Sequence, residues 1–310
     1  MKLEKAPLAT AGLVLGLLGL GNLLSDVSLV VTASCGILAL VTLVYLIYSM
    51  MTDPQSVKNQ ISNPLVSSVF TTFFMSGFLG TVYLKNFFGE NPFIATLIGP
   101  LWLLCFFGIV SHMLIFSLKY LKNFSLDSVF PSWTVLYIGV AIAGLTSPVS
   151  GQFVVGKITI IYGFVATCLV LSIIFKRLKK NPLKAQFKPN TATICAPFSL
   201  VAAAYAVTFS NPNPLIMGIL LILSQVFYSY ILWFLPRLLK RPFSPVFSAF
   251  TFPLVISATA LKNGMRVLGL TGAWQWLLWG EVLLASVIVL GVFLEYLKFF
   301  FKNSHRIQKS

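Results

Sequence analysis

Residues 29–50 read LVVTASCGILALVTLVYLIYSM, a stretch of 22 residues without a charged side chain. A helix needs roughly 20 apolar residues to cross a hydrocarbon core about 30 Å thick, so this stretch alone can span a bilayer. Its apolar residues are continuous rather than alternating, which favours a helix over a strand of a β-barrel. Nine further apolar stretches fill the chain, near residues 8–24, 65–84, 92–118, 131–149, 153–175, 190–209, 213–235, 245–264 and 274–298.

The composition agrees with this pattern. Of the 310 residues, 57% are apolar and 9% are charged, whereas soluble domains carry about 25% charged residues. Lipid admits only helices or closed barrels, so we predict an all-α integral membrane protein with ten transmembrane helices. We expect a single polytopic membrane domain over residues 1–310, in which residues 298–310 form a short basic cytoplasmic tail.

The basic residues predict the orientation. Eighteen of the 22 Lys and Arg residues fall on one side of the predicted spans, and Lys85, Lys157, Lys262 and Arg266 fall on the other. Because cytoplasmic loops carry the excess of Lys and Arg, we expect a multi-pass protein of the cytoplasmic (plasma) membrane with both termini in the cytoplasm. The net charge of +15 would suit nucleic acid, but this one-sided distribution predicts a topology signal and no nucleic-acid partner. The same charges can draw anions towards a mouth.

The spans alternate in character along the chain. Odd-numbered spans are rich in small and hydroxyl residues, which let helices pack closely in lipid, and even-numbered spans are bulkier. A proline stands at the start of each odd span, at spacings of 57, 67, 58 and 56 residues. This indicates an internal repeat, although a simple preference of loops for proline is the alternative. We predict five helical hairpins around an axis, with the odd helices lining a central pore. The prolines are Pro7, Pro64, Pro131, Pro189 and Pro245.

This arrangement predicts a negatively charged cargo. With a cytoplasmic N-terminus, five odd helices start at the cytoplasmic mouth, and each N-terminus carries roughly half a positive charge. Helix N-termini bind anions without needing a basic side chain. Basic residues precede four of these starts, and only three carboxylates lie in the cytoplasmic connections. The basic residues are Lys5, Lys58, Lys188 and Arg241, and the acids are Glu4, Asp53 and Asp127.

No catalytic or cofactor-binding pattern occurs in the sequence. A Ser/His/Asp set, HExxH, a GxxxxGK[ST] loop and a CxxC pair are all missing, so we predict no enzyme activity, no cofactor and no metal. His112 is expected to be a hydrogen-bonded helix residue. Glu281 lies inside the last span. We expect it to pair with Lys262 or Arg266, and a role in proton coupling is the alternative.

Two prolines fall within odd spans and predict kinks. Pro197 lies in the seventh span and Pro253 in the ninth. A proline inside a helix removes one backbone hydrogen bond, and the freed carbonyl is tolerated where it lines a cavity. A bulky apolar ring beside such a kink could close a narrow pore by excluding water. Phe250 and Phe252 are two positions apart, so both cannot face the axis, and helical periodicity alone leaves the choice open.

At these residues the chain resembles the tellurite-resistance/dicarboxylate transporter family. This family includes bacterial TehA-type proteins, plant guard-cell slow anion channels, and fungal malate and sulfite transporters. The segment 248–253 (SAFTFP) resembles the ninth-helix motif of the family, and 192–197 (ATICAP) resembles its seventh-helix segment ending in Ala-Pro. Pro7, Gly12 and Gly16 resemble its opening stretch. The chain departs from some relatives at Val14 and Leu136, where these have prolines.

The resemblance implies a quasi-fivefold ring of helical hairpins, often assembled as a homotrimer in the lipid bilayer. It implies a pore for small inorganic or organic anions that is occluded by a phenylalanine of the ninth helix. By the motif this residue is Phe252, and Gly12 matches a glycine whose missing side chain leaves the pore open. The residues expected to line or kink the pore are Gly12, Gly16, Pro197, Phe250 and Pro253.

Three functional hypotheses compete. The first is a passive or weakly gated anion channel. The second is a coupled carrier or exporter for a C4-dicarboxylate such as malate, for sulfite or for tellurite, which should need a titratable group on the pathway. The third is a membrane-embedded enzyme, which should need a cluster of histidines, carboxylates or cysteines in the spans. No such titratable group stands out on the odd spans and no such cluster occurs in the spans, so the channel is the preferred hypothesis.

Overall fold

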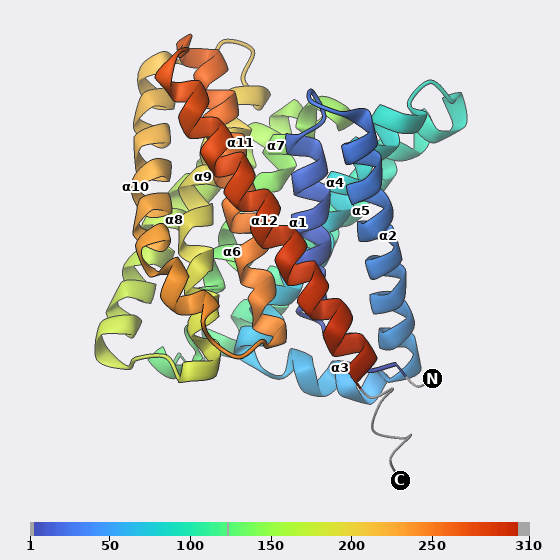
Figure 1. Cartoon of the computed structure of the whole chain (residues 1–310), viewed down its shortest axis with the longest axis vertical. Coiled ribbons are helices and arrows are strands. Elements are labelled where there is room, and N and C mark those ends of the chain that lie inside the picture. The colour runs from blue at the N-terminus through green and yellow to red at the C-terminus, as the bar shows by residue number, and fades with distance from the viewer. Residues whose placement is uncertain (1–2, 123, 303–310) are drawn as a thin grey trace.

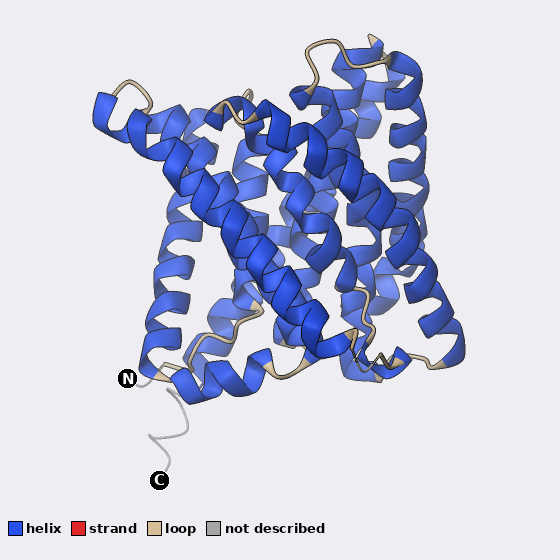
Figure 2. Ribbon diagram, turned by 180° about the vertical axis from the view of Figure 1, so that it is seen from behind, coloured by secondary structure: helices blue, strands red, loops and turns tan. Residues whose placement is uncertain are grey.

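The computed structural model describes residues 3–122 and 124–302, and helices make up most of this part of the chain (Figures 1 and 2). Within these residues no strand occurs. The α-helices are α1 (Thr10–Leu23), α2 (Leu29–Thr52), α3 (Pro54–Ile61), α4 (Pro64–Phe88), α5 (Pro92–Tyr120), α6 (Trp133–Ile138), α7 (Ile142–Ser150), α8 (Phe153–Lys180), α9 (Ala196–Thr208), α10 (Pro214–Leu239), α11 (Thr251–Leu268) and α12 (Ala273–Phe301). Four 3-10 segments are η1 (Leu126–Ser128), η2 (Gly139–Ala141), η3 (Ala185–Cys195) and η4 (Pro245–Phe250).

An Asn-Pro pair starts three of the long helices. The side chain of Asn63 accepts hydrogen bonds from the N–H groups of Leu65 and Val66 at the start of α4, while Pro64 occupies the first helical position. Asn91 with Pro92 and Asn213 with Pro214 begin α5 and α10 in the same way. Asparagine satisfies the unpaired amides of the first turn, and proline has no amide to satisfy there. These pairs therefore determine the residues at which the three helices begin.

The helices are those of a multi-pass membrane protein. In the described part of the chain nine helical segments are long and apolar enough to cross a bilayer. They correspond to the second to tenth predicted spans. The first predicted span contains α1, which is apolar but only 14 residues long. Helix α12 continues to Phe301, so the predicted basic tail begins inside this helix, and residues 303–310 lie outside the described residues.

Burial divides the spans into two groups. In the apolar window of the span Ala185–Thr208, 83% of the residues are buried, whereas in that of Pro92–Tyr120 only 17% are. The spans of α4, α6–α7 and η4–α11 are also largely buried, and nearly every residue of α1 is. The bulky helices α2, α5, α8, α10 and α12 expose leucine, valine and phenylalanine side chains, as surfaces that face lipid do.

Each buried segment packs against the bulky helix that follows it and against other buried segments. Helix α1 contacts α4, α4 contacts α6 and α7, α7 contacts α9, α9 contacts α11, and α11 contacts α1. Hydroxyl groups bridge these neighbours along the buried faces. The bridges are Ser76 to the Ala11 carbonyl (3.4 Å), Ser68 to Ser132 (2.7 Å), Thr134 to the Thr193 carbonyl (3.2 Å), Ser199 to Ser257 (2.9 Å) and Thr251 to the Gly12 carbonyl (2.9 Å).

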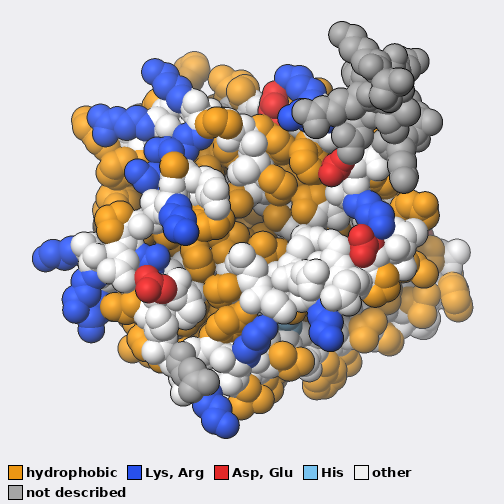
Figure 3. Space-filling model, turned by 90° about the horizontal axis from the view of Figure 1, so that it is seen from below, with side chains coloured by type: hydrophobic (Ala, Val, Ile, Leu, Met, Phe, Trp, Pro, Cys, Tyr) orange, Lys and Arg blue, Asp and Glu red, His pale blue; other side chains and the backbone are white. Residues whose placement is uncertain are grey.

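The beginning and the end of the described chain lie at the same end of the bundle, because the Glu4 amide donates to the Phe300 carbonyl at 2.9 Å. Helix α3, which the sequence analysis did not predict, lies across this end (Figure 1). We call this end of the molecule the basic face, because Lys and Arg side chains lie around its rim while its centre is apolar or neutral (Figure 3). The opposite end, with the loops that follow α1 and α11, is called the far face.

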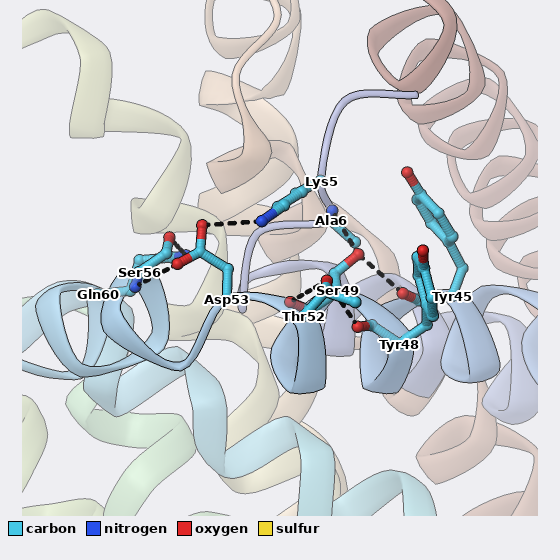
Figure 4. A network of polar contacts seen from close by, with 9 residues as sticks. All are labelled: Lys5, Ala6, Tyr45, Tyr48, Ser49, Thr52, Asp53, Ser56 and Gln60. Atoms are coloured by element: carbon cyan, nitrogen blue, oxygen red, sulfur yellow. Dashed lines mark hydrogen bonds and ion pairs between the residues drawn. The ribbon is translucent and has the colours of Figure 1, made fainter. Parts of the chain in front are cut away.

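A polar network fastens the start of the chain to the basic face (Figure 4). Lys5 forms an ion pair with Asp53 at 3.1 Å, and the amide of Ala6 donates to the Ser49 hydroxyl at 3.0 Å. The pKa of Asp53 is lowered because its carboxylate accepts the Ser56 amide and the Lys5 ammonium. The network sets the position at which α1 enters the bundle.

Candidate functional site

The fifth, seventh and ninth spans change from 3-10 to α geometry partway along their length. Helix α9 begins at Ala196 directly after η3, and α11 begins at Thr251 directly after η4. Pro197 and Pro253 therefore stand in the first turn of an α-helix, where a missing N–H removes no helical hydrogen bond. The two prolines, which the sequence predicted to kink these spans, stand at the transitions from 3-10 to α geometry. The fifth span has the same kind of break at η2 without a proline.

The five buried segments together line a partly open cavity of about 30 Å³, close to the volume of a single water molecule in the liquid. We call it the central cavity. No charged side chain occurs among the described residues that line it, which are apolar or carry a hydroxyl. The lining includes Gly12 of α1, Thr72 and Met75 of α4, Thr134 and Ile138 of α6, Thr193 and Pro197 of the seventh span, and Ser248, Phe252 and Pro253 of the ninth.

The hydroxyl groups that line the central cavity differ in their hydrogen bonds. Thr72, Thr134 and Thr193 donate to backbone carbonyls in their own segments at 2.8–2.9 Å. The Ser248 side chain is buried, and its hydroxyl lies beside that of Tyr296, which donates to the Pro245 carbonyl at 2.6 Å and can accept a hydrogen bond in turn. Ser248 can therefore donate either to Tyr296 or to a solute in the cavity.

The structure places the two candidate phenylalanines differently. Phe250 is fully buried and packs edge-to-face on Phe247, with ring centroids 5.2 Å apart, and it is not among the described residues that line the central cavity. Phe252 lines the central cavity and also a second cavity of about 180 Å³ on the side of the far face. It is the residue that the two described linings share.

Glycines of α1 form the surface against which α11 packs. A Cβ atom at Gly16 would lie 2.4 Å from the Thr251 Cβ, and one at Gly12 would lie 2.9 Å from the Ser248 Oγ. A Cβ atom at Gly19 would lie 3.3 Å from the Phe252 ring. Gly12 is part of the central cavity, whereas Gly16 is not among its described lining residues and serves the contact between the two helices.

The two isolated polar residues behave differently from each other. The ring nitrogen Nε2 of His112 donates to the Ser67 carbonyl at 2.9 Å, as expected for a hydrogen-bonded helix residue. The expected pairing of Glu281 was wrong, because Lys262 and Arg266 both bind Asp26 in the loop after α1. Glu281 is buried, and its carboxyl group lies beside the side-chain amide of Gln225 rather than beside a cation. Within residues 3–122 and 124–302 no group of three or more His, Cys, Asp or Glu side chains could hold a metal ion.

Comparison with protein families identifies the group to which this arrangement belongs. The model of the voltage-dependent anion channel family matches residues 5–297, nearly the whole chain. The chain belongs to this family. The resemblance inferred from segments 192–197 and 248–253 is thereby confirmed. A comparison with curated proteins gives no match. The chain is thus a multi-pass membrane protein of an anion channel and transporter family, whose members are not enzymes.

Sequence reasoning missed part of the cavity lining. The hydroxyl content of the odd spans was a signal for Thr72 and Ser248, but it did not show which face of each helix they occupy. For Ser248 that face depends on the 3-10 geometry of η4, because a 3-10 helix turns by about 120° per residue and an α-helix by about 100°. Lys262 lies in the second cavity beside Asp26, and this pairing joins residues 236 positions apart.

Proposed function

We propose that the chain forms an anion channel whose central pathway is closed by the ring of Phe252. The observation that carries this proposal is that Phe252 lines both the central cavity and the larger cavity towards the far face. The two cavities would join if this one ring turned aside. The side chain is 6% exposed, so its present position is well packed rather than free in a wide opening.

The pathway is proposed to run along the axis of a quasi-fivefold ring of five helical hairpins. The circuit of contacts from α1 through α4, α7, α9 and α11 back to α1 supports this arrangement. In the same proposal, α1 together with the residues before it makes the tenth membrane crossing. The basic face is cytoplasmic and the protein lies in the plasma membrane, since Lys and Arg gather on cytoplasmic loops.

The preference for anions is attributed to the lining and the helix ends. Four of the five buried segments begin an α-helix beside the central cavity, because the first turns of α1, α6, α9 and α11 supply lining residues. Many of the backbone N–H groups in these first turns donate to the carbonyl three residues earlier, as the Gly12 amide does to the Ala9 carbonyl at 3.0 Å. The positive end of the helix dipole lies at the cavity for α1 and α6, which follow turns, whereas α9 and α11 continue η3 and η4, whose aligned amides move that end further back along the chain. No carboxylate among the described lining residues opposes it, and Ser248 can donate a hydrogen bond.

A coupled carrier for a dicarboxylate, sulfite or tellurite is the second proposal within this family. A coupled carrier is expected to have a group that changes charge where the pathway closes, and the described lining of the central cavity beside Phe252 holds none, since Asp26 and Lys262 lie in the second cavity. The channel is therefore preferred. The homotrimer implied by the family resemblance also stays a prediction, which native mass spectrometry in detergent can test.

The decisive variant is Phe252→Ala, compared with Phe250→Ala in planar bilayers. Turning the buried ring into a wet pathway costs roughly 1.5–3 kcal/mol, the price of exposing a phenylalanine side chain. Removing this cost is expected to raise the anion current by about tenfold to a hundredfold. Phe250→Ala should lower stability without this increase, because Phe250 packs on Phe247 away from the cavity. An unchanged current in folded Phe252→Ala protein would refute the gate.

A further inference from the structure

The second cavity, which we call the far vestibule, has a closed end and an open end. At its closed end lies the buried ring of Phe252, and at its open end lie the exposed residues Asp26 and Arg266. Between them it is lined by α1, α4, α7 and α11, and its volume of about 180 Å³ is six times that of the central cavity. A small hydrated anion fits this space, whereas the central cavity holds about one water molecule.

The far vestibule contains one largely buried cation. Lys262 lies ten residues after Phe252 on α11, and its side chain is 18% exposed. Its ammonium donates to the Leu23 carbonyl at 2.8 Å and contacts a carboxylate oxygen of Asp26 at 3.1 Å. Arg266 binds the same oxygen of Asp26 but is 62% exposed. The described lining thus sets two cations against one carboxylate, an excess of one positive charge.

The two partners of the main ion pair differ in exposure. The Asp26 side chain is 58% exposed and stands on the loop between α1 and α2, so water can replace its contact with Lys262. The Lys262 side chain is only 18% exposed, and its ammonium is also bonded to the Leu23 carbonyl inside the cavity. A partly buried ammonium that loses its carboxylate attracts another negative charge, because leaving a buried charge without a partner is costly.

We propose that the far vestibule is a binding site for a small monovalent anion, with Lys262 as its cationic ligand and Asp26 as the counter-ion that the anion displaces. This inference rests on the proposed function, since it places the site directly before the Phe252 gate. Asn22 lines the same cavity, and its amide oxygen has no hydrogen-bond partner among the described residues. Rotation of this amide by half a turn would exchange its oxygen for its NH₂ group, which can donate a hydrogen bond to the anion. Asp26 then lowers the affinity of the far vestibule for the anion, because its carboxylate competes with the anion for Lys262.

The test uses the Phe252→Ala channel in planar bilayers, with nitrate varied in the compartment at the far face. Removing the competitor by Asp26→Asn is expected to lower the half-saturating nitrate concentration about fivefold, the scale of a partly exposed ion pair. Lys262→Met is expected to raise it by at least about fivefold. Lys157→Met is the matched control, because Lys157 also lies towards the far face but sits over the Phe209 ring, 5.5 Å from its centre, outside the described lining. This control should leave the half-saturation unchanged.

A second readout separates this inference from the proposed function. Nitrate-dependent thermal stabilisation of the purified protein, with Phe252 intact, reports binding without conduction. Asp26→Asn should need about fivefold less nitrate for the same stabilisation. Because Asp26 is exposed, this variant is expected to fold even if Lys262→Met does not. If Phe252→Ala carries no current but Asp26→Asn shifts the nitrate-dependent stabilisation, the proposed gate is wrong and the binding site in the far vestibule is supported.

If Phe252→Ala conducts but Asp26→Asn changes neither the half-saturating nitrate concentration nor the stabilisation, the binding site is wrong and the ion pair between Lys262 and Asp26 only stabilises the fold.

Discussion

Replacing Gly16 by alanine places a methyl group at the contact between α1 and α11. The new Cβ would lie 2.4 Å from the Thr251 Cβ and 2.5 Å from its hydroxyl oxygen, and 3.3 Å from the Phe252 amide nitrogen. Carbon atoms in good contact stand about 3.5–4.0 Å apart, so the helices must separate by roughly 1 Å. The separation would also strain the hydrogen bond from Thr251 to the Gly12 carbonyl at 2.9 Å.

The expected loss of stability follows from these contacts. Overpacking costs about 1–3 kcal/mol and the weakened hydrogen bond about 1 kcal/mol, while alanine returns up to about 1 kcal/mol of helix propensity. We expect Gly16→Ala to be less stable by about 2 kcal/mol, which lowers the thermal midpoint in detergent by roughly 5 °C. Gly80→Ala is the matched control, because a Cβ atom on this glycine of α4 meets nothing within 4 Å. It should be neutral or slightly stabilising.

The reasoning can be tested further by relieving the contact from the other side. Thr251→Gly removes the atoms that the new methyl group would meet, so the double-mutant cycle with Gly16→Ala should show a favourable coupling of at least about 1 kcal/mol. If Gly16→Ala matched Gly80→Ala in stability, or if no coupling appeared, close packing of α1 on α11 would not be the reason for this glycine.

Two further outcomes follow from the same structure. Gly19→Ala should produce an anion leak smaller than that of Phe252→Ala, because the new Cβ atom would lie 3.3 Å from the Phe252 ring and displace it slightly. Currents in planar bilayers measure this leak. A Gly19→Ala variant with normal stability and no leak would contradict the prediction. The pKa of Asp26 is lowered, chiefly by the hydrogen bond from Lys262. Its ion pairs therefore stabilise the fold at pH values above the unfolded pKa near 3.9, and this contribution is lost as pH falls through the lower folded pKa. The thermal midpoints of the wild-type protein and of Asp26→Asn should differ by a constant amount between about pH 5 and 8, and this difference should shrink at lower pH. A difference that varied between pH 5 and 8 would contradict the assignment to Asp26.

The membrane-spanning pattern could be predicted from sequence because long apolar runs have few alternatives. The stretch 29–50 has no charged group and becomes α2, and the Asn-Pro pairs at Asn63, Asn91 and Asn213 mark helix starts through purely local hydrogen bonds. The prediction missed α3, whose polar surface lies outside the apolar pattern.

Details of the site needed tertiary information. The family motif pointed to Phe252, but helical periodicity could not choose it over Phe250, because that choice requires the length of η4, which turns the following helix. Glu281 was assigned to Lys262 or Arg266 because they are close in sequence. The structure gives both cations to Asp26, which lies in the loop between α1 and α2 and is brought beside α11 only by the tertiary packing of α1 on α11.

The central claim is that the axis of the bundle admits anions once Phe252 is removed. The most direct measurement is the reversal potential of the Phe252→Ala current across a bilayer with a potassium chloride gradient. We predict that it lies at the equilibrium potential of chloride and shifts when nitrate replaces chloride on one side. A reversal at the potassium potential would contradict the account, as would the absence of current in correctly folded protein.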